Sequence, residues 1–195
     1  KRSMPPTLEA LAARLQALED REAIRELIAS YGPLADTGAA EALSQLWTED
    51  GRYAVGGMTE AKGRAAIAAL IDGAVHRGLM ADGCAHALGP VTIDLDGDTA
   101  TARGHSVVFR ADGTGGWTAH RVSANRWHLA RTPEGWRVTA RENALLDGAE
   151  ALGLSLNRLE GGGVGRQKRL NPLDAEGSIN LKHGLRRRCF DRSMP

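Results

Sequence analysis

Apolar residues recur every three or four positions in the first part of the chain, and in the second part they alternate with polar residues. The first spacing predicts an amphipathic helix over residues 7–35, with Thr7 able to cap its start. Asp20 is a candidate cap for a second helical segment, which would split this helix near residue 19. Gly32-Pro33 predicts a break or kink. The second spacing, with a period of two, is typical of β-strands.

Two shorter helices and five strands complete the predicted elements. The first short helix buries Trp47 on one side, and a loop is expected over 78–83. Because helices come first and an antiparallel meander follows, the order predicts an α+β fold, a curved antiparallel sheet wrapped around N-terminal helices. The expected helices are 39–48 and 63–76, and the expected strands are 52–55, 84–95, 98–110, 117–131 and 136–146.

Two of the predicted strands carry polar residues on the same parity as large apolar ones. This arrangement is typical of a pocket lining rather than a solvated face. The leucine stripe at the start of the first helix is long enough to contribute a partner surface as well as core. The strand residues that share a parity are His105, Val107 and Phe109 in one strand and Ser123, Asn125, Trp127 and Leu129 in the next. The leucine stripe of the first helix consists of Leu8, Leu11, Leu15 and Leu18.

Candidate chemistry begins at the end of the first helix. Tyr31 and Asp36 lie there, and His86 opens the first long strand. If the helix end caps a curled sheet, these side chains share one interior pocket. A His–Asp pair is a ready general base, because the carboxylate orients the imidazole and stabilises its charged form. The alternatives are that His86 and Tyr31 are core residues and that Asp36 closes a turn.

Charge divides the chain unevenly. Residues 157–195 hold nine basic and four acidic residues, a net +5, which leaves −4 for residues 1–156 in a chain of total charge +1. The sequence predicts one domain over 8–150 and a basic, loosely ordered tail over 151–195. Basic tails bind nucleic acid in some proteins, but a solvated extension is the preferred interpretation here.

Several classes of protein are not expected. The chain has no run of about 18 apolar residues for a membrane span and no secretory pattern at its start, so a cytoplasmic location is predicted. Cys84 and Cys189 do not form a disulfide framework. No histidines stand at zinc-site spacing, and Gly161–Gly165 lacks the strand and helix of a dinucleotide-binding loop. Nucleic-acid binding is not predicted for the domain.

Five stretches carry a resemblance to a known family: Leu18–Leu27, Leu46–Gly51, Gly63–Ile67, Arg121–Trp127 and Gly135–Val138. Together they resemble the nuclear transport factor 2-like superfamily, in particular its SnoaL-like branch. The resemblance covers about residues 8–150 and implies a cone-shaped cystatin-like fold with a deep pocket. The enzymes that the chain most resembles are scytalone dehydratase, bile-acid 7α-dehydratase and hexachlorocyclohexane dehydrochlorinase.

The resemblance also implies roles for individual residues. It makes His86 the catalytic base and Asp36 its partner, with Tyr31 and His105 as further catalytic groups. Alternation from Trp136 places Arg141 on the outer face, so a pocket role for it requires a bulge. The residues implied to line the substrate pocket are Ser123, Asn125, Arg141, Trp127, Phe109 and Cys84.

The predicted function is that of a lyase, most simply a dehydratase, that needs neither a metal nor an organic cofactor. Its predicted substrate is a small hydrophobic cyclic molecule of steroid, terpenoid or polyketide type. An isomerase or aldol cyclase of the same fold is the alternative, and a binding module without catalysis is a third. Related proteins imply a homo-oligomer, a dimer or a trimer.

Overall fold

The structure is a computed structural model that describes residues 5–56 and 59–147, all within one unit of the chain, Lys1–Leu159. Predictions on residues 148–195, including the tail, Cys189 and Gly161–Gly165, lie outside the described residues. The helices are α1 (Leu8–Asp36), α2 (Ala40–Ser44), α3 (Arg64–Asp72) and α4 (Ala74–Asp82). The strands are β1 (Trp47–Val55), β2 (Thr59–Lys62), β3 (Cys84–Asp96), β4 (Thr99–Ala111), β5 (Trp117–Thr132) and β6 (Gly135–Leu145).

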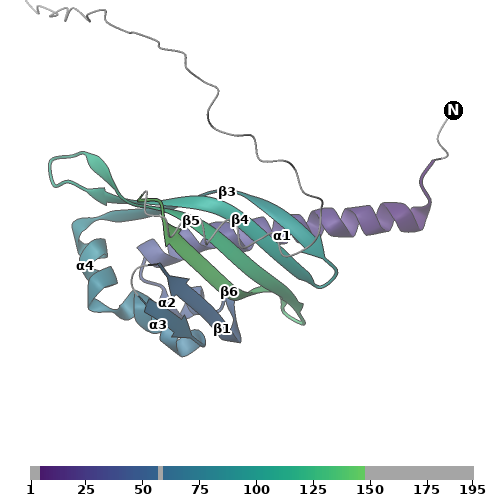
Figure 1. Cartoon of the computed structure of the whole chain (residues 1–195), viewed down its shortest axis with the longest axis horizontal. Helices are drawn as coiled ribbons and strands as arrows, with labels where there is room; N and C mark the ends of the chain where they lie inside the picture. Colours follow the sequence, from purple (N-terminus) through teal and green to yellow (C-terminus); the bar gives the residue numbers. More distant parts are fainter. Residues whose placement is uncertain (1–4, 57–58, 148–195) are drawn as a thin grey trace, which may run out of the picture. The chain divides into compact units, whose positions relative to one another are not determined.

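The strands form one curved sheet in the order β2-β1-β6-β5-β4-β3, which stays open between β2 and β3 (Figure 1). Neighbouring strands are antiparallel except β1 and β6, which run parallel. The N-terminal helices pack against this sheet. The α+β architecture predicted from the order of the elements is therefore confirmed.

The helix α1 is one uninterrupted helix of 29 residues, so the predicted split near residue 19 and the predicted break at Gly32-Pro33 are wrong. Asp20 does not start a helix, because its carboxylate is used in a tertiary contact. It accepts hydrogen bonds from Trp136 Nε1 at 3.1 Å and from Arg131 Nη2 at 2.6 Å. Pro33 lies in the last turn of α1, so the hydrogen bond that it cannot donate costs the helix little stability.

The leucine stripe of α1 is not part of the core, contrary to one of its two predicted roles. Its four leucines, Leu8, Leu11, Leu15 and Leu18, are 86, 44, 57 and 64% exposed. In Figure 1 the N-terminal turns of α1 run past the edge of the sheet, which explains this exposure. The buried apolar residues of α1 begin at Ile24, and a partner surface on the stripe stays a prediction.

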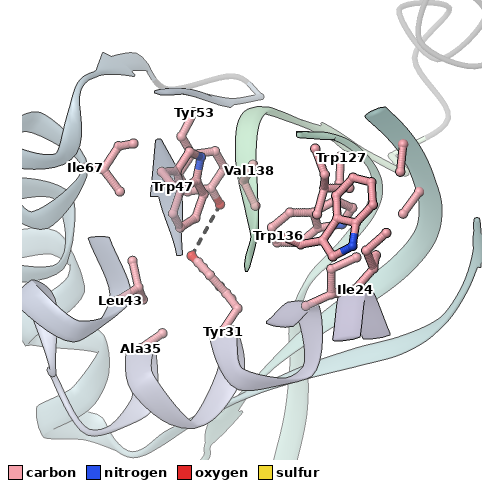
Figure 2. Packing of buried hydrophobic residues seen from close by; sticks show 14 of the residues in the cluster. Ile24, Tyr31, Ala35, Leu43, Trp47, Tyr53, Ile67, Trp127, Trp136 and Val138 are labelled. Carbon is pink, nitrogen blue, oxygen red and sulfur yellow. Dashed lines mark hydrogen bonds between the residues drawn. The ribbon is translucent and has the colours of Figure 1, made fainter. Parts of the chain in front are cut away.

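Three local predictions fail because tertiary pairing overrides local pattern. Trp47 opens β1 rather than ending a helix, and its ring stacks on Tyr53 with 5.7 Å between centroids. The edge strand β2, which pairs only with β1, was not predicted. The helix α4 continues through residues 78–82, where a loop was expected. Figure 2 shows Trp47, Tyr53, Trp127 and Trp136 together in the core.

A bulge in β6 changes which residues face the helices. Val138 and Ala140 pair with consecutive residues of β5, so Thr139 is an extra residue in β6. Before the bulge the even-numbered residues are buried, and after it Arg141 and Asn143 are buried. The bulge that a pocket role for Arg141 requires is thus present.

Candidate active site

A cavity of about 410 Å³ lies between the helices and the sheet. This volume suits a small ligand. Aliphatic side chains of α3 and α4 form much of its wall, and polar side chains enter it mainly from the sheet and from α1. The polar and aromatic lining residues are Tyr31, Tyr53, His76, His86, Ser106, His120, Arg121, Ser123, Arg141 and Asn143.

Asp36, at the end of α1, and His86, in β3, form a hydrogen-bonded dyad. Asp36 Oδ1 lies 2.6 Å from His86 Nδ1, and Asp36 Oδ2 accepts from the backbone N–H of His86 at 2.9 Å. Because a carboxylate only accepts, Nδ1 carries the hydrogen, which leaves Nε2 of the neutral ring as a proton acceptor. His86 lines the cavity, so an imidazole nitrogen able to accept a proton stands at its wall.

The dyad depends on an unusually close approach of α1 to β3 at Gly32. A Cβ added at Gly32 would lie 2.2 Å from the carbonyl oxygen of His86. Gly32 and Asp36 are four residues apart and therefore lie on one face of α1. The glycine thus lets the helix touch β3 one turn before the carboxylate meets the imidazole.

Burial lowers the pKa of His86 below its usual 6.5, and the hydrogen bond and charge of Asp36 partly oppose this shift. Two further groups near the ring, His76 of α4 and Arg141 of β6, lower the pKa further, and the ring of Tyr31 lies edge-on to it at 6.2 Å between centres. A lowered pKa keeps the imidazole neutral at neutral pH. That is the protonation state a base requires.

We expect the His86 imidazole to titrate with a midpoint below 6.5, measured by NMR of its ring C–H signals. In Asp36→Asn the midpoint should fall further, because the carboxylate that favours the charged ring is gone. Since the folded-state pKa is lowered, protonation of His86 opposes folding, and stability present above pH 6.5 should decrease as the pH falls toward the His86 pKa. A midpoint above 6.5, or a rise in Asp36→Asn, would contradict this account of the dyad.

Arg141 is held among aromatic rings beside the dyad. Its guanidinium carbon lies 4.1 Å from the ring centres of both Tyr31 and Trp127 and 4.7 Å from that of Tyr53. The hydroxyls of Tyr31 and Tyr53 are hydrogen-bonded at 3.4 Å (Figure 2). Burial is the main cause that raises the pKa of Tyr31, so its hydroxyl stays protonated and able to donate.

Asn125 organises the polar side chains of the sheet. Its Oδ1 accepts from Arg141 Nε at 3.1 Å, from Arg141 Nη2 at 2.8 Å and from Asn143 Nδ2 at 3.0 Å. Its Nδ2 donates to Ser106 Oγ at 2.9 Å. Ser123, on the same face of β5, is buried and lines the cavity. The inward parity predicted for Ser123, Asn125, Trp127 and Leu129 is confirmed, since all four are buried. Of these only Ser123 is among the residues that line the cavity, so the predicted lining roles of Asn125 and Trp127 are not met by direct contact with it.

The structure does not bring His105 and Phe109 to the cavity. His105 is exposed, and neither residue is among those that line the wall. The buried residues of this part of β4 are Ser106 and Val108, so the predicted parity is wrong. Both parities of this stretch carry apolar residues, and a shift of one residue exchanges the two faces of a strand.

Cys84 lies beside the dyad rather than in the wall, with its Sγ 3.5 Å from Asp36 Oδ1. Burial, aided by Asp36, raises the pKa of its thiol to about 11, so the group stays a neutral thiol. Cys84, Asp36 and His86 offer atom types that bind metals, and these atoms lie within 4.8 Å of one another. Their contacts are those of a hydrogen-bonded Asp36–His86 pair with a neutral thiol beside it.

Sequence reasoning missed several polar and aromatic residues of the site, among them Tyr53, Asn143 and His76. Tyr53 lies on a predicted strand, but nothing local distinguishes it from core. Asn143 faces inward only because of the bulge in β6. His76 comes from α4, where its Nε2 lies 2.9 Å from the carbonyl oxygen of Ala35 and its ring centre 5.5 Å from that of His86. No sequence signal relates His76 to His86, because only the packing of α4 brings them together.

The SnoaL-like domain family matches residues 16–142. The match covers more than half of the chain, and the protein therefore belongs to the SnoaL-like family, within the nuclear transport factor 2-like superfamily that the sequence resembles. Within the part of the chain that the structure describes, no helix is long and apolar enough to cross a membrane. A search of curated proteins found no match.

Solved structures support this assignment. An NTF2-like protein with a cystatin-like fold from Novosphingobium aromaticivorans is 69% identical, with a TM-score of 0.73 over 76% of this chain and 96% of that one. A protein of unknown function from Mycobacterium tuberculosis is 25% identical, with a TM-score of 0.60 over 68% and 75% of the two chains. A candidate scytalone dehydratase from Novosphingobium aromaticivorans, 18% identical with a TM-score of 0.55 over 66% and 85%, shares the fold.

Proposed function

We propose that this protein is a cofactor-independent dehydratase acting on a small hydrophobic cyclic molecule, with His86 as the base. The observation that carries the proposal is the 2.6 Å contact between Asp36 Oδ1 and His86 Nδ1 at the wall of an apolar cavity. A binding module has no need of a buried imidazole oriented by a carboxylate. The dyad therefore favours an enzyme over a protein that only binds.

The proposed reaction begins on a carbon next to a carbonyl group. His86 Nε2 takes a proton from this carbon, and the electron pair of the broken C–H bond moves onto the carbonyl oxygen as an enolate. The imidazolium is stabilised by the carboxylate of Asp36. Tyr31 donates a hydrogen bond to the carbonyl oxygen, and Arg141 stabilises the developing negative charge.

The second step expels the leaving group. The enolate electrons return to form a carbon–carbon double bond, and the bond from the neighbouring carbon to its hydroxyl group breaks. The departing hydroxide takes the proton held by His86 and leaves as water, so His86 returns to its neutral form. In this scheme one histidine serves as base and then acid, and the exposed His105 has no part.

An isomerase or an intramolecular aldol cyclase is the alternative, because either reaction also begins with proton abstraction by a base such as His86. It differs in the fate of the proton and the enolate. The isomerase returns the proton to another carbon, and the cyclase lets the enolate carbon attack a second carbonyl. Neither product differs in mass from its substrate.

The test is to incubate the protein with cyclic hydroxy-ketones, steroids, terpenoids and halogenated rings, and to identify products by mass spectrometry. We expect a class of hydroxy-ketones to lose one molecule of water. An unchanged mass with a new retention time would assign an isomerase or cyclase instead. Ligands that raise the melting temperature, as tight binders do, but are never consumed would support a binding protein and contradict the proposal.

A further inference from the structure

We propose that the cavity binds a cyclic ligand that carries a negatively charged oxygen in its ground state, such as a ring carboxylate, and that Arg141 is its receptor. This inference deepens the proposed function by naming a charge on the substrate. It differs from stabilisation of a developing enolate, because it requires the ligand to bind as an anion before any chemistry begins.

The first observation is that Arg141 is a buried cation without a counter-charge. Arg141 is 2% exposed, and among the described residues no carboxylate lies within ion-pair distance of its guanidinium group. A guanidinium stays protonated in proteins, so it cannot escape burial by losing its charge. Burying a charge without a partner is strongly unfavourable, so proteins seldom keep such a group without a use.

The second observation is that Arg141 is oriented but not satisfied. Asn125 accepts from its Nε and one terminal nitrogen, and the rings of Tyr31 and Trp127 contact it at 4.1 Å. These neutral partners fix the side chain. The other terminal nitrogen, Nη1, has no hydrogen-bond partner. Arg141 lines the cavity, and a donor that is fixed in place, covered from water and left without an acceptor is what an anionic oxygen would satisfy.

The third observation is the character of the wall. The described residues that line the cavity include no aspartate or glutamate. They do include four basic residues, His76, His86, Arg121 and Arg141. The nearby carboxylate of Asp36 is bound by His86. Ser123 Oγ, 1% exposed and also without a hydrogen-bond partner, provides a second polar point on the sheet side of the same cavity.

Much of the remaining wall is apolar or aromatic, which favours a flat or cyclic body behind the charge. Leu70, Ile71, Val75 and Leu79 from α3 and α4 lie across the cavity from the sheet. An inorganic anion would leave this surface unused. We therefore assign the site to an organic acid whose ring contacts the helices while its charged oxygen binds Nη1 of Arg141.

The test compares three ring acids of increasing size, benzoate, 2-naphthoate and 9-anthroate, with their neutral amides at pH 7.5. Binding is measured by calorimetry on the full chain, as wild type, Arg141→Met and His86→Ala. Methionine retains much of the length and apolar contact of arginine without its charge. The control is Arg110→Met, because Arg110 is an exposed residue of β4 paired with Asp82.

We expect wild type to bind at least one acid roughly ten- to a hundredfold more tightly than its amide. Arg141→Met should lose this preference, whereas Arg110→Met and His86→Ala should keep it. The proposal is overturned if no acid binds more tightly than its amide to wild type, a comparison that needs no variant to fold. It is also overturned if a folded Arg141→Met keeps the preference.

These outcomes are separate from those of the proposed function. Preference for acids in both wild type and His86→Ala, without any loss of water, supports the anion site and leaves the dehydratase unsupported. Loss of water from neutral hydroxy-ketones without any preference for acids supports the dehydratase and overturns the anion site.

Discussion

Replacing His86 with alanine is expected to lower kcat/KM about 10²–10⁴-fold on the substrate that the product screen identifies. The reason is that proton abstraction loses its base, since Asp36 has no other imidazole within hydrogen-bond distance among the described residues. The substrate should still bind, because the cavity wall keeps its apolar residues and Arg141. The measurement is steady-state kinetics together with calorimetric binding.

The fold should survive this change. Asp36 keeps a hydrogen bond from the backbone N–H of residue 86 at 2.9 Å, which does not depend on the side chain there. The melting temperature should therefore change little, and circular dichroism should be unchanged. Because the imidazole lies at the wall of an existing cavity, its removal enlarges that cavity rather than opening a new one in the core.

A matched comparison is His105→Ala, which removes a histidine from the exposed face of β4. We expect it to retain activity within a factor of about two, because the side chain does not line the cavity. Near-full turnover in His86→Ala would eliminate the proposed mechanism. A large loss in His105→Ala would show that the second histidine predicted from the sequence reaches the substrate after all.

Replacing Gly32 with alanine is expected to destabilise the protein by about 2–3 kcal/mol, although alanine has the higher helix propensity. The added Cβ would lie 2.2 Å from the carbonyl oxygen of His86. That neighbour is backbone and cannot rotate away, so α1 and β3 must separate. The measurement is equilibrium unfolding in urea, with the free energy of unfolding compared between wild type and variant.

The same substitution at Gly78 is the control, since Gly78 also lies within a helix but has no atom within 4 Å of an added Cβ. We expect Gly78→Ala to stabilise the protein by about 0.5–1 kcal/mol. Separation of α1 from β3 should also pull Asp36 from His86, so Gly32→Ala should lose activity even below its melting temperature. Unchanged stability in Gly32→Ala would refute the close approach of the two elements.

Both predictions show how backbone features set up the chemistry. A glycine lets α1 approach β3, and one extra residue in β6 turns Arg141 inward. Neither Gly32 nor Thr139, the extra residue of β6, is among the residues that line the cavity. Each of them decides which side chains meet in the cavity, and the chemistry then follows from ordinary properties of imidazole, carboxylate and guanidinium groups.

The sequence by itself determined the class of fold and the positions of the long elements, because helical and strand periodicities are local properties of the chain. It also determined the inward parity of Ser123 and Trp127, since polar and large apolar residues share every second position of β5 from Ser123 to Leu129 and all four are buried. The pairing of Asp36 with His86 was reached by resemblance to a family and by the chemistry of the two residue types. Spacing along the chain does not imply it.

Only the tertiary structure decided the rest of the site. The outward direction of His105 depends on a register that a slip of one residue would reverse, and the inward direction of Arg141 depends on a bulge. His76 meets His86 because α4 packs against the end of α1. These relations join residues far apart in the chain. Their free energy comes from packing and pairing across the whole fold, and no local pattern of apolar and polar residues records it.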